Sequence, residues 1–257
     1  MNPIKTMKTS VSSLLALFCV ATVPSLTANE VVFTETFPRS TADVASVNWQ
    51  TFNSANATNQ SANTNFASGF VISSSTGMGG EGNYLVTSFK GVGLTFTDKF
   101  DAIDRSITEI ATLSFATSNN NTTDSYRFAI QLDLGGTTAW YATDAVFRQA
   151  TAGGTVFNNT GETKSFTFTT DASAWRELTF TPGSTLSLAG SSIVNDLPMG
   201  SLMAAGIYND SNDDVLRWDH FEIAVIPEPA VFGALLGLAG LSLCLLRRKR
   251  GGFTGGE

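Results

Sequence analysis

Two acidic residues interrupt short apolar patterns near the two ends of the central part of the chain. In "VVFTETF", Glu35 shares one face of a predicted strand with Val31 and two phenylalanines. In "RWDHFEI", Asp219 shares a predicted face with Arg217 and Phe221. A carboxylate on an apolar face must be protonated, paired with a cation or bound to a metal ion. An ion pair with Arg217, or a strand end that faces water, is the simplest outcome for either carboxylate.

A second candidate site is the aromatic pair Trp140 and Tyr141 in "TAWYATDAVF". Adjacent residues of a strand point to opposite faces of a sheet, so one ring faces the core and the other faces outward. An exposed aromatic ring beside polar groups can stack on a sugar ring. The alternative is core packing for one ring and incidental exposure for the other.

The sequence predicts no enzyme. His220 is the only histidine, so a zinc site built on histidines or a Ser/His/Asp triad has little to draw on. Two carboxylates could still hydrolyse a glycosidic bond, but no compact Glu-x-Asp-x-Glu motif is present. The run "NDSNDD" (209–214) places oxygen ligands at alternate positions, yet it lacks the glycine and distant glutamate of an EF-hand. We therefore predict a solvated turn at 209–214.

The charge of the chain disfavours nucleic acid as a partner. Residues 29–224 contain nine Lys/Arg and twenty Asp/Glu, a net charge of −11. Such a surface repels a phosphate backbone. Both cysteines, Cys19 and Cys244, fall in apolar terminal segments, so residues 29–224 contain no disulfide and must be held together by a hydrophobic core.

The central part, residues 29–224, is predicted to be all-β. "SYRFAIQLDL" alternates large apolar residues with Arg, Ala, Gln and Asp, which is the period of a strand with one buried face. Similar short stretches, such as "KSFTFTT" and "TLSLAG", are separated by Gly-rich and Asn-rich turns. This spacing predicts an antiparallel, jelly-roll-like β-sandwich.

The end-to-end pattern of strands resembles jelly-roll sandwiches of the carbohydrate-binding and laminin-G-like kind. The likeness runs from "VVFTETF" through "AWRELTFTPGSTLSLAG" to "LPMGSLMAAGIYNDSNDDVLRWDHFEI". Carbohydrate-binding jelly rolls often hold a structural Ca²⁺ between their terminal strands. The resemblance therefore implies that Glu35 and Asp219 are calcium ligands, with backbone carbonyls supplying others. A fold of this kind does not by itself define a function.

The N-terminal residues are predicted to be a secretory signal peptide, 1–28. Lys5 and Lys8 precede an apolar stretch from Val11 to Val23, and small residues follow it. We predict cleavage after Ala28. A buried N-terminal helix is the alternative.

The C-terminal residues 225–250 combine a Pro-Glu-Pro motif, an uncharged apolar run and a basic cluster. The run 230–246 has 17 residues and predicts a short transmembrane helix, which leaves the basic end in the cytoplasm and the central domain outside. The segment resembles a PEP-CTERM sorting domain, followed here by a tail, 251–257. The residues that carry this likeness are Pro227, Glu228, Pro229, Arg247, Arg248, Lys249 and Arg250.

The PEP-CTERM resemblance implies export and recognition by an exosortase, a protease of the inner membrane, in bacteria that make extracellular polysaccharide. The sequence thus predicts a non-enzymatic protein that is first membrane-anchored, with its domain outside. After processing it is expected at the cell surface or in the extracellular matrix, associated with extracellular polysaccharide. A carbohydrate-binding module is the first alternative, and a glycan hydrolase or lyase is the second.

Overall fold

The computed structural model confirms the all-β prediction. Strands are the regular structure of the described residues, apart from the short 3-10 helices η3 (Ile107–Glu109) and η5 (Ala172–Ala174). The strands pair antiparallel in two sheets, which confirms the antiparallel sandwich. The structure describes residues 29–37, 48–53, 58–60, 69–72, 77–78, 84–88, 92–99, 104–119, 122–152, 161–209 and 216–227.

The segments predicted to be a signal peptide and a transmembrane helix, 1–28 and 230–246, lie outside these described residues. Within the described part of the chain, no helix has the length and apolar character needed to cross a bilayer.

The first sheet has six strands in the order β10-β7-β14-β5-β4, with β1 also paired to β14. Strand β14 pairs with β7 on one side, and on its other side it pairs first with β5 and then with β1. Its strands are β1 Glu30–Glu35, β4 Gly69–Ile72, β5 Leu85–Ser88, β7 Ile110–Thr117, β10 Glu162–Thr167 and β14 Leu216–Val225.

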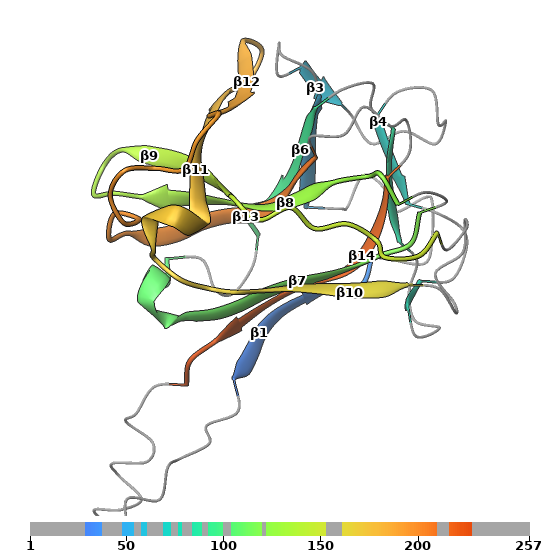
Figure 1. Ribbon diagram of the computed structural model, residues 1–257, viewed down its shortest axis with the longest axis horizontal. Coiled ribbons are helices and arrows are strands. Elements are labelled where there is room, and N and C mark those ends of the chain that lie inside the picture. Colours follow the sequence, from blue (N-terminus) through green and yellow to red (C-terminus); the bar gives the residue numbers. More distant parts are fainter. Residues whose placement is uncertain are drawn as a thin grey trace, which may run out of the picture.

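The second sheet has eight strands in the order β12-β11-β9-β8-β13-β6-β2-β3. Figure 1 shows its central strands above the first sheet, while both of its ends bend upward, away from that sheet. Its strands are β2 Trp49–Asn53, β3 Thr58–Gln60, β6 Gly93–Thr97, β8 Tyr126–Asp133, β9 Thr138–Thr143, β11 Trp175–Thr181, β12 Thr185–Leu188 and β13 Ser201–Asn209.

The main core fills the space between the two sheets. The alternation predicted for β8 is confirmed, because Phe128, Ile130 and Leu132 are fully buried in this core. Aromatic rings from both sheets meet there edge to face: the ring of Trp49 lies 4.7 Å from that of Trp218, between ring centroids. Such pairs add directional contacts to the burial of apolar area.

A second apolar cluster, the outer cluster, covers the face of the eight-stranded sheet that points away from the first sheet. Its alanines lie on β8, β9 and β13, and its rings include Phe52, Phe96, Trp140 and Tyr208. Because the sheet bends, rings from strands that are not neighbours meet: Phe52 of β2 and Phe180 of β11 lie 4.8 Å apart between centroids. At Gly206 of β13 a Cβ atom would lie 2.0 Å from the carbonyl oxygen of Thr95, so the close approach of β6 requires glycine.

The two ends of the described chain leave the sandwich side by side. Glu30 at the start of β1 pairs with Val225 at the end of β14. Figure 1 shows both strands reaching the lower left of the molecule together. The first and last strands are therefore neighbours in one sheet, and β14 ends at Val225.

Two β-bulges correct the predicted faces of the terminal strands. The register of β1 against β14 shifts between Val31 and Phe33, which leaves Val31 53% exposed rather than on the core face. The register of β14 against β7 shifts between Asp219 and Glu222, where His220 has a left-handed φ of 47°. Phe221 therefore shares the core with Trp218, and the predicted common face of Asp219 and Phe221 is wrong.

Candidate functional site

The carboxylate of Glu35 is held on the core side of β1. Its Oε1 atom accepts a hydrogen bond from the backbone N–H of Phe37 at 2.8 Å, and its Oε2 atom accepts one from Nε1 of Trp49 at 3.2 Å. Phe37 has a left-handed φ of 53° and packs its ring against Trp49 and Trp218. Glu35 thus fixes the turn that follows β1 and the indole of a core tryptophan.

Asp219 is fully buried at the bulge of β14. Its Oδ2 atom accepts the backbone N–H of Met78 at 2.8 Å, and its Oδ1 atom accepts the backbone N–H of His220 at 2.8 Å. The Nδ1 atom of His220 lies 3.2 Å from Oδ2. Burial, only partly offset by these donors, raises the pKa of Asp219 to about 6. The carboxyl group ties the segment before β5 to β14.

This arrangement does not fit a calcium site between the terminal strands. Both oxygens of Glu35 and both oxygens of Asp219 face N–H donors, whereas Ca²⁺ needs six to eight oxygen ligands around it. Within the described residues, no group of three or more His, Cys, Asp or Glu side chains is placed to hold a metal ion.

Trp140 and Tyr141 lie on opposite faces of the eight-stranded sheet, as adjacent strand residues should. Trp140 belongs to the outer cluster and is 7% exposed, with its ring 4.8 Å from Phe96 and 5.6 Å from Phe180 between centroids. Tyr141 packs against the main core and is half-buried, and burial raises the pKa of its hydroxyl. The structure therefore separates the two residues, and it places Trp140 among rings that already cover it.

Two arginines flank the outer cluster at the end of β9. Arg127 donates from Nη1 to the carbonyl oxygen of Thr143 at 2.8 Å. Arg176 donates from Nε to Oδ1 of Asp144 at 2.6 Å, and this hydrogen bond lowers the pKa of the Asp144 carboxyl. Both side chains are thus held by hydrogen bonds at the end of β9.

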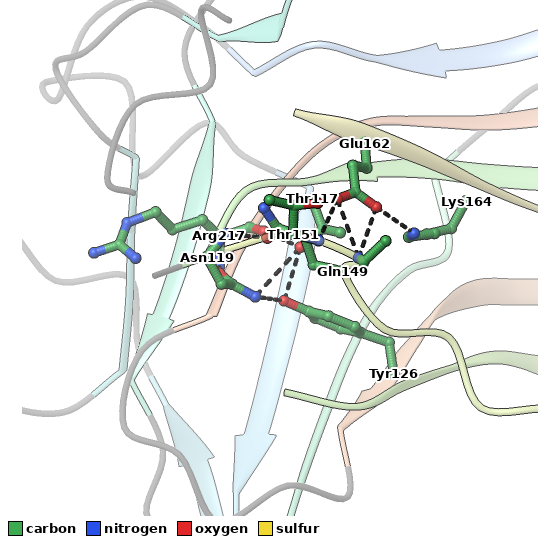
Figure 2. A network of polar contacts seen from close by, with 9 residues as sticks. Thr117, Asn119, Tyr126, Gln149, Thr151, Glu162, Lys164 and Arg217 are labelled. Atoms are coloured by element: carbon green, nitrogen blue, oxygen red, sulfur yellow. Dashed lines mark hydrogen bonds and ion pairs between the residues drawn. The ribbon is translucent and has the colours of Figure 1, made fainter. Parts of the chain in front are cut away.

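A buried polar network, drawn in Figure 2, lies at the end of β7 where Thr117 pairs with Trp218, opposite the end where Ile110 pairs with Val225. Asn119 is its centre: its Nδ2 atom donates to the hydroxyls of Tyr126 and Thr117, and its Oδ1 atom accepts the backbone N–H of Arg217 at 2.9 Å. Thr117 in turn donates to the carbonyl oxygen of Arg217 at 3.0 Å. The backbone N–H of Asn119 donates to Oε1 of Gln149. We call these five residues the Asn119 network.

The Asn119 network joins the two sheets with neutral groups. Thr117 ends β7 and Arg217 belongs to β14, whereas Tyr126 begins β8 of the other sheet. Tyr126 is fully buried, and this burial raises the pKa of its hydroxyl beyond any ordinary pH. The hydroxyl therefore keeps its proton, and its hydrogen bonds with Thr117 and Asn119 join β8 to the other sheet.

Glu162 extends the polar contacts toward the surface, as Figure 2 shows. Its carboxylate accepts the backbone N–H groups of Ala150 and Thr151 at 2.9 Å each, and Nζ of Lys164 donates to it at 2.7 Å. Burial would raise the pKa of Glu162, but these donors lower it. Glu162 thus fastens the loop that carries Gln149 to the edge strand β10.

The predicted sorting motif begins directly after the fold. The backbone N–H of Ile226 donates to the carbonyl oxygen of Glu109 at 2.7 Å, so the chain is held to the sandwich up to the residue before Pro227. Pro227 is half-buried. The predicted cleavage site at Ala28, the motif residues Glu228 and Pro229, and the basic cluster 247–250 lie outside the described residues.

Sequence reasoning did not identify the Asn119 network. Asn119 lies in the stretch "SNNNTTD", which has the composition of a turn. The sequence therefore predicted a turn here, not a buried amide. One feature of the sequence could have indicated a buried amide. Asn119 directly follows "LSFATS", which has the pattern of a buried strand. The partners on β8 and β14 come from distant parts of the chain.

Comparison with known proteins identifies no family. No protein-family model matches the chain, and no curated protein matches it. Among solved structures, the chain is similar to the CBM22-1–GH10 modules of endo-1,4-β-D-xylanase 10B from Clostridium thermocellum, solved with xylohexaose. The similarity has 12% sequence identity and a TM-score of 0.44, and it covers 78% of this chain and 29% of that chain. The chain thus spans under a third of that structure's length, and its own two sheets define its fold.

Proposed function

We propose that this chain is an exported, non-enzymatic β-sandwich protein that a PEP-CTERM-type segment delivers to the cell surface or extracellular matrix. One observation carries the proposal: β14 ends at Val225 and Ile226 is still hydrogen-bonded to Glu109, directly before the motif Pro227-Glu228-Pro229. A membrane protease that recognises this motif would meet an extended, proline-flanked peptide next to a finished domain. Its partners would be an exosortase and the inner membrane.

The pairing of Glu30 with Val225 supports the same arrangement. The predicted signal cleavage site, after Ala28, and the sorting motif then leave the domain at one end. Export through the N-terminal segment and anchoring through the C-terminal one would place this end at the membrane, with the rest of the sandwich projecting away from it.

Replacement of Glu228 tests the proposal in cells of the source organism. We expect Glu228→Ala to remain in the membrane fraction with its C-terminal segment attached, while the wild-type chain is found outside without that segment. Glu257→Ala, which removes an acid from the tail, is the matched control and should behave as the wild type. Normal processing and location of the Glu228→Ala chain would contradict the proposal.

A second candidate function is association with extracellular polysaccharide at the outer cluster. The observation that favours it is that the first sheet packs against only one face of the eight-stranded sheet, while Trp140, Phe96 and Phe180 gather on the other. Phe180 is only partly buried. A sugar ring could stack there if the ring of Phe180 turned aside.

Retention on the organism's own polysaccharide tests this second candidate. Trp140 is packed among other rings, so Trp140→Phe is chosen because it keeps an aromatic ring in the cluster. Phe180→Ala and Trp140→Phe should each weaken retention by about tenfold, a loss typical of a removed stacking contact. Tyr141→Phe, on the opposite face, is the control and should bind as the wild type. Equal retention of all three variants would favour a structural role without sugar binding.

A further inference from the structure

Three of the five exposed large apolar side chains among the described residues lie toward one end of the sandwich. The large hydrophobic residues with high exposure among those described are Val31 (53%), Val146 (39%), Val194 (93%), Met199 (66%) and Ile226 (50%). Val146 precedes Phe147, which pairs with Tyr126 in the Asn119 network, so it belongs to the opposite end. The other four lie on β1, on the loop before β13 and directly after β14.

Hydrogen bonds bring three of these segments together around η3. Ile226 donates its backbone N–H to the carbonyl oxygen of Glu109, the last residue of η3, at 2.7 Å. The first residue of η3, Ile107, donates to the carbonyl oxygen of Gly200, the neighbour of Met199, at 3.1 Å. Val31 pairs with Ala224 next to this point, and the bulge of β1 turns its side chain out. We call Val31, Met199, Ile226 and η3 the terminal end.

The length of the following chain places the terminal end close to a membrane. Four peptide steps separate Ile226 from Ala230, where the uncharged apolar run begins. A fully extended chain spans at most about 3.6 Å per residue, so the distance is at most about 14 Å. If the run 230–246 enters the bilayer, the terminal end cannot leave the headgroup region.

We propose that the terminal end docks on the bilayer surface, with Val31, Met199 and Ile226 inserted among the headgroups. This inference rests on the proposed function, because it requires the C-terminal segment to be in the membrane. Apolar side chains gain free energy on leaving water, and the short tether makes a weak affinity sufficient by raising the effective concentration. Without the tether three side chains would bind a bilayer poorly.

The charges at the terminal end select the kind of bilayer. Glu30 is exposed beside Val31, and Asp196 is exposed on the same loop as Met199. Acidic groups are repelled by an anionic lipid surface. The surface that fits is therefore one of neutral, zwitterionic headgroups, and docking should weaken as anionic lipid is added.

Fluorescence quenching by lipid measures the docking in the full chain. The protein, with Cys19→Ser and Cys244→Ser, is reconstituted in phosphatidylcholine vesicles that contain lipid spin-labelled near the glycerol. A fluorophore is attached at Thr108→Cys on η3 or, as the matched control, at Val146→Cys at the opposite end. We expect quenching about threefold stronger at position 108 than at position 146, and less of it in vesicles with 30% anionic lipid, a composition chosen at roughly natural levels.

A longer tether distinguishes affinity of the terminal end for the bilayer from proximity that the short linker imposes. Ten Gly/Ser residues inserted between Ile226 and Pro227 release the domain by about 20 Å. The quenching at position 108 should fall by less than about twofold in this chain, since the apolar side chains hold it down. Adding Val31→Ser, Met199→Ser and Ile226→Ser should then reduce it to the value at position 146. If the serine substitutions change nothing, the docking proposal is overturned.

The remaining outcomes also decide the question. Release of the chain from vesicles by alkaline carbonate would overturn membrane insertion, and the docking with it. A chain that resists carbonate but shows equal quenching at both positions would overturn the docking alone. If the fluorophore at position 108 is shielded in native membranes but not in lipid vesicles, the terminal end binds a protein partner. That result would overturn the proposal that it docks on the bilayer.

Discussion

The two ends of the sandwich are built in opposite ways, although the same strands connect them. Strand β7 runs from Ile110, which pairs with Val225 near the terminal end, to Thr117 in the Asn119 network. At the network end, buried polar groups from both sheets form hydrogen bonds with one another. At the terminal end, apolar side chains remain exposed. One end is therefore organised for stability in water, and the other retains surface that gains from a contact.

The largest expected effect breaks the network end. Asn119→Ala removes two donors and an acceptor and leaves Tyr126, Thr117 and the N–H of Arg217 without the amide in a buried site. We expect a loss of about 3 kcal/mol in the free energy of unfolding, since each buried group left unpaired costs ~1–3 kcal/mol. Chemical denaturation measures it, with Asn195→Ala in an exposed loop as the control. A loss below about 1 kcal/mol would contradict the role given to Asn119.

A pH-dependent effect tests the bulge of β14, which lies between the two ends. The pKa of Asp219 is about 6 in the folded protein and 3.8 in the unfolded chain. The folded state therefore holds its proton more tightly, so stability falls as pH rises from about 4 to about 6. A difference of about two pKa units corresponds to about 3 kcal/mol.

Asp219→Asn should remove this fall. Subtracting the unfolding free energies of the variant and the wild type at each pH isolates the contribution of Asp219. We expect the variant to gain on the wild type by about 3 kcal/mol between pH 4 and pH 7. A flat difference would contradict the raised pKa. A melting temperature that falls on adding a chelator, in the wild type and not in the variant, would instead restore calcium at Asp219.

A smaller effect belongs to the edge of the network end. Glu162→Gln keeps the shape of the side chain but replaces charge-assisted hydrogen bonds to Ala150, Thr151 and Lys164 by neutral ones. We expect a loss of about 1 kcal/mol, and faster amide hydrogen exchange at Ala150 and Thr151. Unchanged exchange at both amides would show that Glu162 does not hold this loop.

The smallest effect on folding is expected at the terminal end. Met199→Ser changes a side chain that is 66% exposed, so the free energy of unfolding should change by less than about 0.5 kcal/mol. A loss of more than about 1 kcal/mol would mean that Met199 contributes to the core, and the contrast between the ends would then disappear.

The sequence predicted where the strands lie better than it predicted which side chains of each strand face the core. The alternation of "SYRFAIQLDL" specifies a strand and its buried side because the period of two is set by backbone geometry alone. The opposite faces of Trp140 and Tyr141 followed from the same rule. The bulges could not be predicted, since a single residue in a left-handed conformation, such as His220, reverses every face beyond it.

The positions of the candidate site residues depend on which face of its strand each one occupies and on the curvature of the eight-stranded sheet. A straight strand pattern brings Asp219 to the same side as Phe221, whereas the bulge turns it toward Met78. The burial of Trp140 depends on the bending of the eight-stranded sheet, which brings Phe96 over from β6, a strand that is not a neighbour of β9. Both are long-range properties, and neither appears in the local order of residue types.

Mass spectrometry of both termini of the mature protein from native cells tests the central claim most directly. The account predicts a chain that begins near Asn29 and ends near the Pro227-Glu228-Pro229 motif, recovered outside the inner membrane. Recovery of the intact chain from Met1 to Glu257 as a soluble cytosolic protein would contradict it.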